Sequence, residues 1–188
     1  ILNVQRGGPS TGLPTKTEQS DLLQVMFGRN GESPLPVIAA RSPRDCFDVA
    51  QEAWRISSRF MIPVIILSDG YIANGAEPWK IPDVAELEKI SISHPGPIEE
   101  GETFLPYSRN EDLARPWALP GTETLMHRLG GLEKEDLTGN VSYDPDNHQY
   151  MTNIRQEKVD RIAHVVDPVE VSGPASGDLL VLSWGGTY

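Results

Sequence analysis

One loop near the start of the chain carries residues whose types and spacing suit the binding of an anion. A short apolar strand over residues 1–5 leads into the run Arg6-Gly7-Gly8-Pro9-Ser10-Thr11-Gly12-Leu13-Pro14-Thr15. Arg6 can bind a carboxylate or a phosphate through two parallel N–H donors. Thr15 and Glu18 have the spacing of a capping box for a helix over 16–27, whose first N–H groups favour an anion. The sequence therefore predicts an anion-binding loop at the carboxyl end of a strand, where open α/β sheets usually bind ligands.

The elements that must position this loop alternate between strands and helices. Apolar runs over 37–40 and 61–67 predict two further strands. Between them, Ser42-Pro43 is typical of a helix start, and one helical stripe carries Cys46, Val49, Ala53, Ile56 and Phe60. This alternation within about seventy residues predicts an α/β fold with a doubly wound, mainly parallel sheet.

The remainder of the chain is less regular. Prolines interrupt residues 74–148, which we interpret as an extended excursion over the sheet with one short helix near 83–89. A helix is expected over 151–165, a linker over 172–177 and a strand over 179–183. We therefore divide the chain into an α/β domain, 1–171, and a segment, 172–188, that begins a second domain. Both chain ends look cut, which suggests a piece of a longer polypeptide.

Composition excludes several classes of function. The net charge of −11 argues against nucleic-acid binding, and no apolar run approaches the roughly 20 residues of a membrane span. The single cysteine, Cys46, cannot hold an iron–sulfur cluster, which takes about four thiolates, and it fits a cytoplasmic protein with a buried structural thiol. The four histidines have no metal-ligand spacing.

Three other motifs indicate structural roles. The glycine-rich loop is not a P-loop, because Leu13 follows Gly12 where that motif requires Lys. Asp69, in Ser68-Asp69-Gly70, is interpreted as a turn residue at a strand end. The segment that contains Asp144 and Asp146 lacks the Gly and the closing Glu of a calcium loop, so we expect turn and N-cap roles for these two residues.

The run from Asn3 to Gln24, which contains the specific motif from Gln5 to Thr15, resembles the 2-oxoacid:ferredoxin oxidoreductases, specifically the alpha subunit or its fused pyrimidine-binding domain. The resemblance resumes at 34–40, 63–71 and 143–148, and it therefore spans most of the chain. It implies the α/β pyrimidine-binding domain of thiamine-diphosphate enzymes, with 172–188 as the linker and first strand of a transketolase-C-terminal-like domain.

The resemblance also implies roles for individual residues. Arg6 would bind the substrate carboxylate, Thr15 would line the same pocket, and Ser10 and Thr11 are further candidates through their hydroxyl groups. It assigns no catalytic residue to this chain. The glutamate that activates the aminopyrimidine and a Tyr-Pro-Ile-Thr-Pro segment would lie upstream of Ile1. We therefore expect the isolated fragment to be inactive.

The function implied is the oxidative decarboxylation of a 2-oxoacid to an acyl-CoA with electrons passed to ferredoxin. Thiamine diphosphate with Mg²⁺ would belong mainly to a partner beta subunit, since the Asn-Asn pair that should follow Ser68-Asp69-Gly70 is missing. An iron–sulfur cluster would also belong to another chain, because the single Cys46 cannot hold one. The overall likeness favours 2-oxoglutarate, while aryl or branched 2-oxoacids stay open. The alternative is a non-catalytic assembly module whose prolines and tryptophans, Trp79 and Trp117, form an interface.

Overall fold

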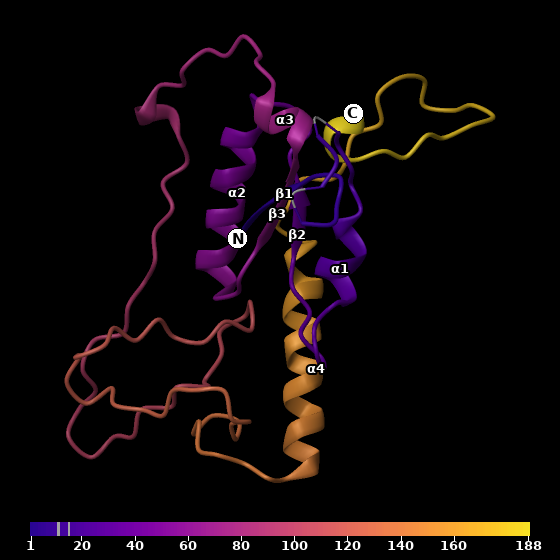
Figure 1. Cartoon of the computed structure of the whole chain (residues 1–188). Coiled ribbons are helices and arrows are strands. Elements are labelled where there is room, and N and C mark those ends of the chain that lie inside the picture. The colour runs from indigo at the N-terminus through magenta and orange to yellow at the C-terminus, as the bar shows by residue number, and fades with distance from the viewer. Residues whose placement is uncertain (11, 15) are drawn as a thin grey trace.

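A three-stranded parallel sheet organises the computed structural model, which describes residues 1–10, 12–14 and 16–188 (Figure 1). Strands β1 (Leu2–Gln5), β2 (Val37–Ala39) and β3 (Ile65–Asp69) lie in the order β1-β3-β2. Buried β3 is central, with Gln5 opposite Asp69 and Ala39 opposite Leu67. The parallel α/β fold predicted from the alternation of apolar runs is confirmed.

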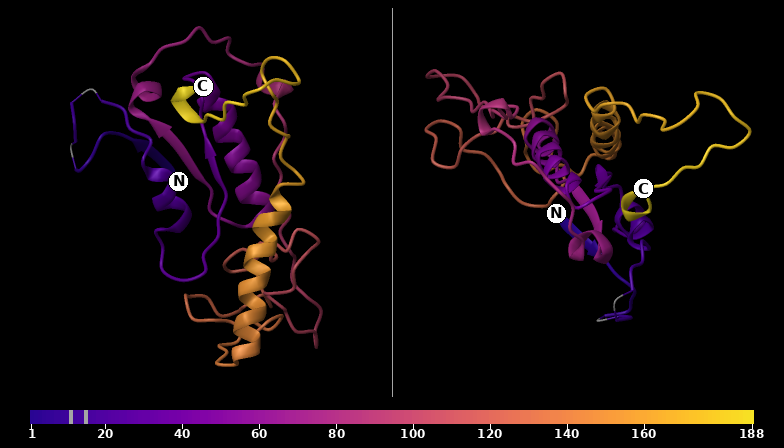
Figure 2. Two further views of the ribbon diagram at one scale, coloured as in Figure 1. Left: turned by 90° about the vertical axis from the view of Figure 1, so that its right-hand side faces the viewer. Right: turned by 90° about the horizontal axis from the view of Figure 1, so that it is seen from above.

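Helices cover both faces of this sheet because side chains alternate along each strand. The face with Ile38 and Ile66 packs against α2 (Asp45–Phe60), whose Ala53, Ile56 and Phe60 are buried in the core. The C-terminal end of α4 (Pro145–Ile162) joins this cluster beside α2 (Figure 2). Helix α1 (Asp21–Phe27) lies on the opposite face. Most of the apolar stripe predicted for α2 is therefore the core of the molecule.

Helix α1 is shorter than the sequence predicted, and it begins too late for Glu18 to take part in the predicted capping box. The helix begins at Asp21, and Ser20 at its N-cap makes no side-chain cap. Residues 16–20 are not helical, so Glu18 lies outside the helix, where its carboxylate accepts a hydrogen bond from the Gly8 N–H at 3.3 Å. Asp21 N–H instead donates to the Gln5 side chain at 3.1 Å. A contact between distant segments thus sets where α1 begins.

The excursion between α3 (Gly70–Asn74) and α4 is largely irregular, as predicted, with one 3₁₀ turn, η1 (Val84–Glu86). It runs alongside α2 before reaching the start of α4 (Figure 1). The indole N–H of Trp117 donates to the carbonyl of Ser58 at 2.9 Å, and Arg59 pairs with Asp112 at 2.7 Å. These contacts attach the excursion to α2, so Trp117 has a structural role rather than that of a free interface residue.

The C-terminal part departs from the sequence prediction at two places. Helix α4 starts at Pro145, six residues earlier than predicted, because the Asp144 carboxylate caps the N–H groups of Asp146 and Asn147 at 2.7 and 3.1 Å. Residues 179–183, predicted as the first strand of a second domain, form no strand among the described residues, and their leucines and valine are exposed. The strand in a second domain stays a prediction. The last turn, η2 (Gly185–Thr187), returns to β3. Within the described ranges, no helix is long and apolar enough to cross a membrane.

Candidate functional site

Two polar side chains are almost completely buried where β1 and β3 end. Gln5 and Asp69 stand opposite each other in the sheet, and each is 1% exposed. The Gln5 amide donates to the carbonyl of Ser68 at 3.2 Å and accepts from the N–H of Asp21. Gln5 thereby fixes the direction in which the chain leaves β1.

Asp69 is the N-cap of α3 and also holds two remote segments. One carboxylate oxygen accepts the N–H groups of Tyr71 and Ile72 at 2.8 and 2.9 Å. The other oxygen accepts the Gln19 amide at 3.2 Å and the N–H of Gly186 at 3.1 Å. A Cβ at position 186 would overlap this second oxygen, so glycine is required for the contact. The turn role predicted for Asp69 is confirmed.

The Arg6 loop is closed by its own backbone. Gly7 N–H donates to the carbonyl of Lys16 at 3.2 Å, and Leu13 N–H donates to the carbonyl of Gly7 at 3.1 Å. Gly12 has a φ of 70°, and a Cβ there would overlap the Gly7 carbonyl oxygen and lie 3.3 Å from Nη1 of Arg6. Glycine at position 12 therefore lets the loop fold back and lets the Arg6 side chain pack over it.

Arg6 lines an open groove of about 1,080 Å³ at the carboxyl ends of the strands. Two further cations, Lys16 and Arg41, line the same groove, together with one carboxylate, Glu77; Arg41 pairs with Asp45 at 3.6 Å. Hydrogen bonds from the Ser42 hydroxyl and the Arg44 N–H lower the pKa of Glu77 and hold it at the start of α2. Arg6 and Lys16 make no ion pair within the described residues. The groove therefore has an excess of positive charge that suits an anionic ligand.

The remaining predicted site residues are placed only in part. Ser10 is exposed, with a φ of 54°, and is not among the described residues that line the groove. Thr11 and Thr15 lie outside the described residues. Their proposed roles, like that of Ser10, stay predictions. Sequence reasoning missed Gln5 and Gln19, because a glutamine carries no signal of burial or of a distant partner in a single sequence.

The described residues do not fit a magnesium diphosphate site. All four hydrogen bonds to Asp69 come from N–H donors, so both of its oxygens are already occupied. No group of three or more His, Cys, Asp or Glu side chains with metal-site geometry occurs in the described part of the chain. Burial and the neighbouring Asp45 raise the pKa of the Cys46 thiol, which agrees with the structural role predicted for it. We accordingly derive no step through a metal or cofactor at these residues.

Comparison with known proteins identifies the family. Residues 1–142 match the family model described as pyruvate flavodoxin/ferredoxin oxidoreductase, thiamine diphosphate-binding. The chain belongs to this family. The match includes the Arg6 loop, all three strands and most of the excursion.

Curated relatives extend along the whole chain. It is 55% identical over 190 residues to the 2-oxoglutarate oxidoreductase subunit KorA of Mycobacterium tuberculosis, covering 100% of this chain and 28% of that protein. It is 28% identical over 192 residues to the 2-oxoglutarate synthase subunit KorA of Methanothermobacter thermautotrophicus, covering 98% of this chain and 48% of that protein. The chain thus spans about a quarter to a half of these relatives.

A solved structure shares the fold. The 2-oxoglutarate:ferredoxin oxidoreductase from Magnetococcus marinus, with 2-oxoglutarate, coenzyme A and succinyl-CoA bound, matches with a TM-score of 0.77 and 34% identity. The match covers 92% of this chain and 30% of that one. The α/β arrangement described above is therefore that of a domain in this class of enzyme.

Proposed function

We propose that this chain is part of the alpha subunit of a thiamine-diphosphate-dependent 2-oxoacid:ferredoxin oxidoreductase, and that Arg6 binds the substrate carboxylate. One observation carries the proposal: Arg6, Lys16 and Arg41 line one groove at the carboxyl ends of parallel strands. A 2-oxoacid presents a carboxylate that a guanidinium recognises through two parallel hydrogen bonds. Several cations in one groove favour a dicarboxylate, and 2-oxoglutarate is our preferred substrate.

The role assigned to Arg6 is positioning. A charge-assisted pair fixes the carboxylate so that the adjacent carbonyl carbon faces the reactive centre. The chemistry of decarboxylation would come from thiamine diphosphate with Mg²⁺, and electron transfer from an iron–sulfur cluster, both mainly on a beta subunit. Ferredoxin and coenzyme A complete the reaction. We place the complex in the cytoplasm and expect no turnover from the fragment alone.

Residues 172–188 remain proposed as the beginning of a second, transketolase-C-terminal-like domain. Residues 168–183 project away from the sheet as a long loop (Figure 1), which suits a connection between domains. The docking of Gly186 on Asp69 ties the end of this segment to the first domain.

The test compares the full-length alpha–beta complex with its Arg6→Ala and Arg6→Lys variants in coenzyme A-dependent viologen reduction. Arg6 is exposed in this chain, and the proposal places its pair with the substrate in the closed site of the assembled complex. Loss of such a buried pair costs about 2–4 kcal/mol, so Arg6→Ala should raise KM for one 2-oxoacid by roughly 30-fold or more. Arg6→Lys keeps the charge but lacks the planar fork, and it should recover only part of the loss. Arg128→Ala removes an exposed arginine outside the groove and serves as the control.

A non-catalytic assembly module is the second candidate, and exposed apolar side chains favour it. Leu2, Trp54 and Tyr71 are 65%, 59% and 70% exposed. Of the tryptophans predicted for such an interface, Trp79 is 43% exposed but packs on Phe47 with ring centroids 5.2 Å apart. A full complex that assembles but fails to reduce viologen with any of the 2-oxoacids would support the assembly module and reject the enzymatic proposal.

A further inference from the structure

A second cavity, remote from the Arg6 groove, lies between α4 and the excursion. It has a volume of about 490 Å³, within the range of small-molecule sites. Its walls come from α4, from Met61 just after α2, and from two excursion segments, 107–115 and 130–134. Five basic side chains line it: Arg109, Arg115, Lys134, Arg155 and Lys158.

The charge of this cavity is unbalanced. Among the described residues, only two carboxylates pair with its basic side chains: Glu133 contacts Arg155 at 3.4 Å, and Asp136 pairs with Arg109 at 2.5 Å. Five basic groups against these two leave three positive charges without a counter-charge, in a chain whose net charge is −11. The ammonium of one of them, Lys134, donates to the carbonyls of Gly130 and Leu132, whereas the side chains of Lys158 and Arg115 make no hydrogen bond within the described residues. Such a concentration of one sign attracts an anion of the opposite sign.

Several hydrogen-bond donors at the cavity have no acceptor in the described part of the chain. Lys158 makes no hydrogen bond or ion pair there, and burial together with Arg109, Arg115 and Arg155 lowers its pKa to about 8. The Arg115 guanidinium stacks on the Tyr107 ring at 4.6 Å, which leaves the N–H groups at its edge available. Nε of Arg155 is buried without a partner. The donor excess matches a ligand made of acceptor oxygens.

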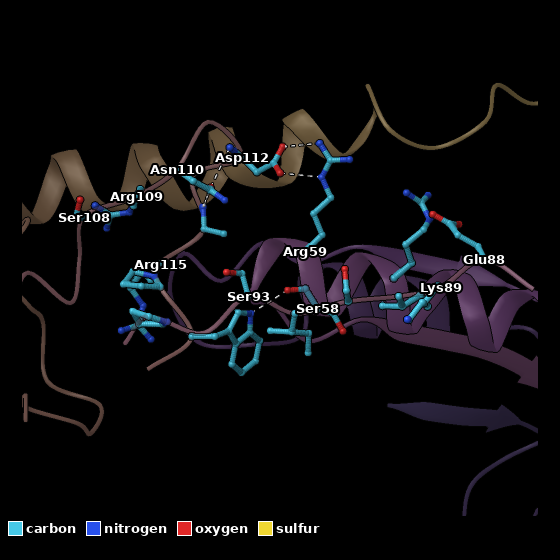
Figure 3. A pocket seen from close by; sticks show the side chains of 18 residues that line it. Ser58, Arg59, Glu88, Lys89, Ser93, Ser108, Arg109, Asn110, Asp112 and Arg115 are labelled. Atoms are coloured by element: carbon cyan, nitrogen blue, oxygen red, sulfur yellow. Dashed lines mark hydrogen bonds and ion pairs between the residues drawn. The ribbon is translucent and has the colours of Figure 1, made fainter. Parts of the chain in front are cut away.

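A neighbouring cavity of about 660 Å³ has more of its charge paired, because within the described residues carboxylates pair with three of its five basic side chains, which are Arg55, Arg59, Lys89, Arg109 and Arg115. There Arg59 forms a two-point pair with Asp112 at 2.7 and 2.9 Å, and Arg55 pairs with Glu52 at 2.5 Å. Figure 3 shows the Arg59–Asp112 pair near the middle, with Arg109 and Arg115 at one end. Arg109 and Arg115 line both cavities, whereas Lys134, Arg155 and Lys158 line only the cavity beside α4.

We propose that the cavity between α4 and the excursion binds the phosphate or diphosphate group of a small molecule, held chiefly by Lys158 and Arg115. A single carboxylate would leave two of the three unbalanced charges unmet, whereas a phosphate ester carries about two negative charges and a diphosphate more. The ammonium of Lys158 supplies a point charge, and the edge of Arg115 supplies paired donors. This site is independent of the Arg6 groove and of the substrate assigned to it.

The test measures the chemical reactivity of Lys158 in the full-length alpha–beta complex. The complex is treated with acetic anhydride at pH 7.5, and the acetylation of each lysine is quantified by peptide mass spectrometry. The rates in inorganic phosphate and in pyrophosphate are compared with the rate in sodium chloride at the same ionic strength. Pyrophosphate should protect Lys158 at least fivefold, and phosphate less, while exposed Lys80 is unchanged. Protection by phosphate equal to that by pyrophosphate would assign a monoester site, which is also within the proposal.

Variants identify the groups that hold the anion. Arg115→Gln should abolish protection of Lys158, whereas Arg128→Gln removes the same charge from an exposed position of the excursion and should retain it. The wild-type measurement stands by itself if Arg115→Gln fails to assemble. Because viologen reduction plays no part in the readout, the outcome is separate from that for Arg6.

Two results would overturn the proposal. Acetylation of Lys158 that pyrophosphate leaves unchanged would show that no such anion binds. Lys158 could instead be unreactive in the complex with or without pyrophosphate, but reactive in the separated alpha subunit. That result would show that an acidic segment of the partner subunit occupies the cavity.

Discussion

The groove at the strand ends and the basic cavity beside α4 both collect positive charge, but different elements build them. The groove rests on β1 and β3, and the polar groups buried beneath it, Gln5 and Asp69, have hydrogen-bond partners. The cavity is formed by irregular chain against one helix, and Lys158 is mostly buried there without a counter-charge. The buried polar groups next to the groove are hydrogen-bonded and stabilise the fold, whereas the unpaired charge of Lys158 in the cavity destabilises it.

The difference shows where ligand binding changes stability most. An exposed charge such as Arg6 keeps its hydration and costs the folded state little. A buried ammonium without a partner is unfavourable until an anion compensates it. Binding at the cavity should therefore stabilise the fold more than binding of the same anion at the groove.

The largest expected effect on stability is at Asp69, the buried carboxylate at the end of β3. Asp69→Ala leaves four N–H donors without their acceptor, and at about 1–3 kcal/mol for each buried unsatisfied group it should lower the free energy of unfolding by at least ~3 kcal/mol. Urea unfolding of the full-length alpha subunit in its complex measures this. Asp83→Ala removes a cap at the exposed turn η1 and is the matched control, expected to cost about 1 kcal/mol or less. Equal losses would mean that Asp69 is an ordinary cap.

The next effect concerns the unpaired charge of the cavity. Lys158→Met should raise the free energy of unfolding near pH 7, in buffer without phosphate, by about 3 kcal/mol, since each unit by which the pKa is lowered corresponds to about 1.36 kcal/mol. The folded-state pKa of about 8 lies below the unfolded value, so the unfolded chain binds more protons above pH 8 and wild-type stability rises with pH there.

The advantage of Lys158→Met should consequently shrink between pH 8 and pH 10. Thermal melts of the complex at several pH values measure this, with Lys80→Met as the exposed control. A constant difference across this range would indicate a packing effect and remove the electrostatic contrast between the two sites.

A smaller effect is expected from the loop that carries Arg6. Gly12→Ala places a Cβ against the Gly7 carbonyl at a positive φ, which should displace Arg6 and raise KM for the 2-oxoacid by about tenfold, or roughly 1.4 kcal/mol. Gly8→Ala is the control, because a Cβ there has nothing within 4 Å. Identical KM values for the two variants would argue that the loop does not position the substrate.

The smallest effect is expected at the neighbouring cavity of about 660 Å³. Asp112→Asn breaks the pair with Arg59, whose side chain is 42% exposed, and such surface pairs contribute about 0.2–1 kcal/mol. Unfolding of the complex in urea should show a loss within that range. A loss as large as that of Asp69→Ala would make the excursion as important to stability as the sheet.

The sequence by itself determined the parallel sheet, the core stripe of α2 and the position of the Arg6 loop. Those features depend on apolar periodicity and on glycine and proline placement, which are local signals. Local signals also gave the turn role of Asp69 and the irregular course of the excursion. The Arg6 groove therefore began as a prediction from the order of a strand, a loop and a helix.

Only the tertiary structure decided where α1 begins, because a hydrogen bond from Asp21 to Gln5 replaces the expected capping box. The same holds for residues 179–183, whose apolar run predicts a strand but finds no partner within the described chain. The basic cavity joins residues 107–115, 130–134 and 151–158, and no spacing in the sequence brings them together. Burial and hydrogen bonding between distant segments are non-local, and they set which charges are paired and which are left for a ligand.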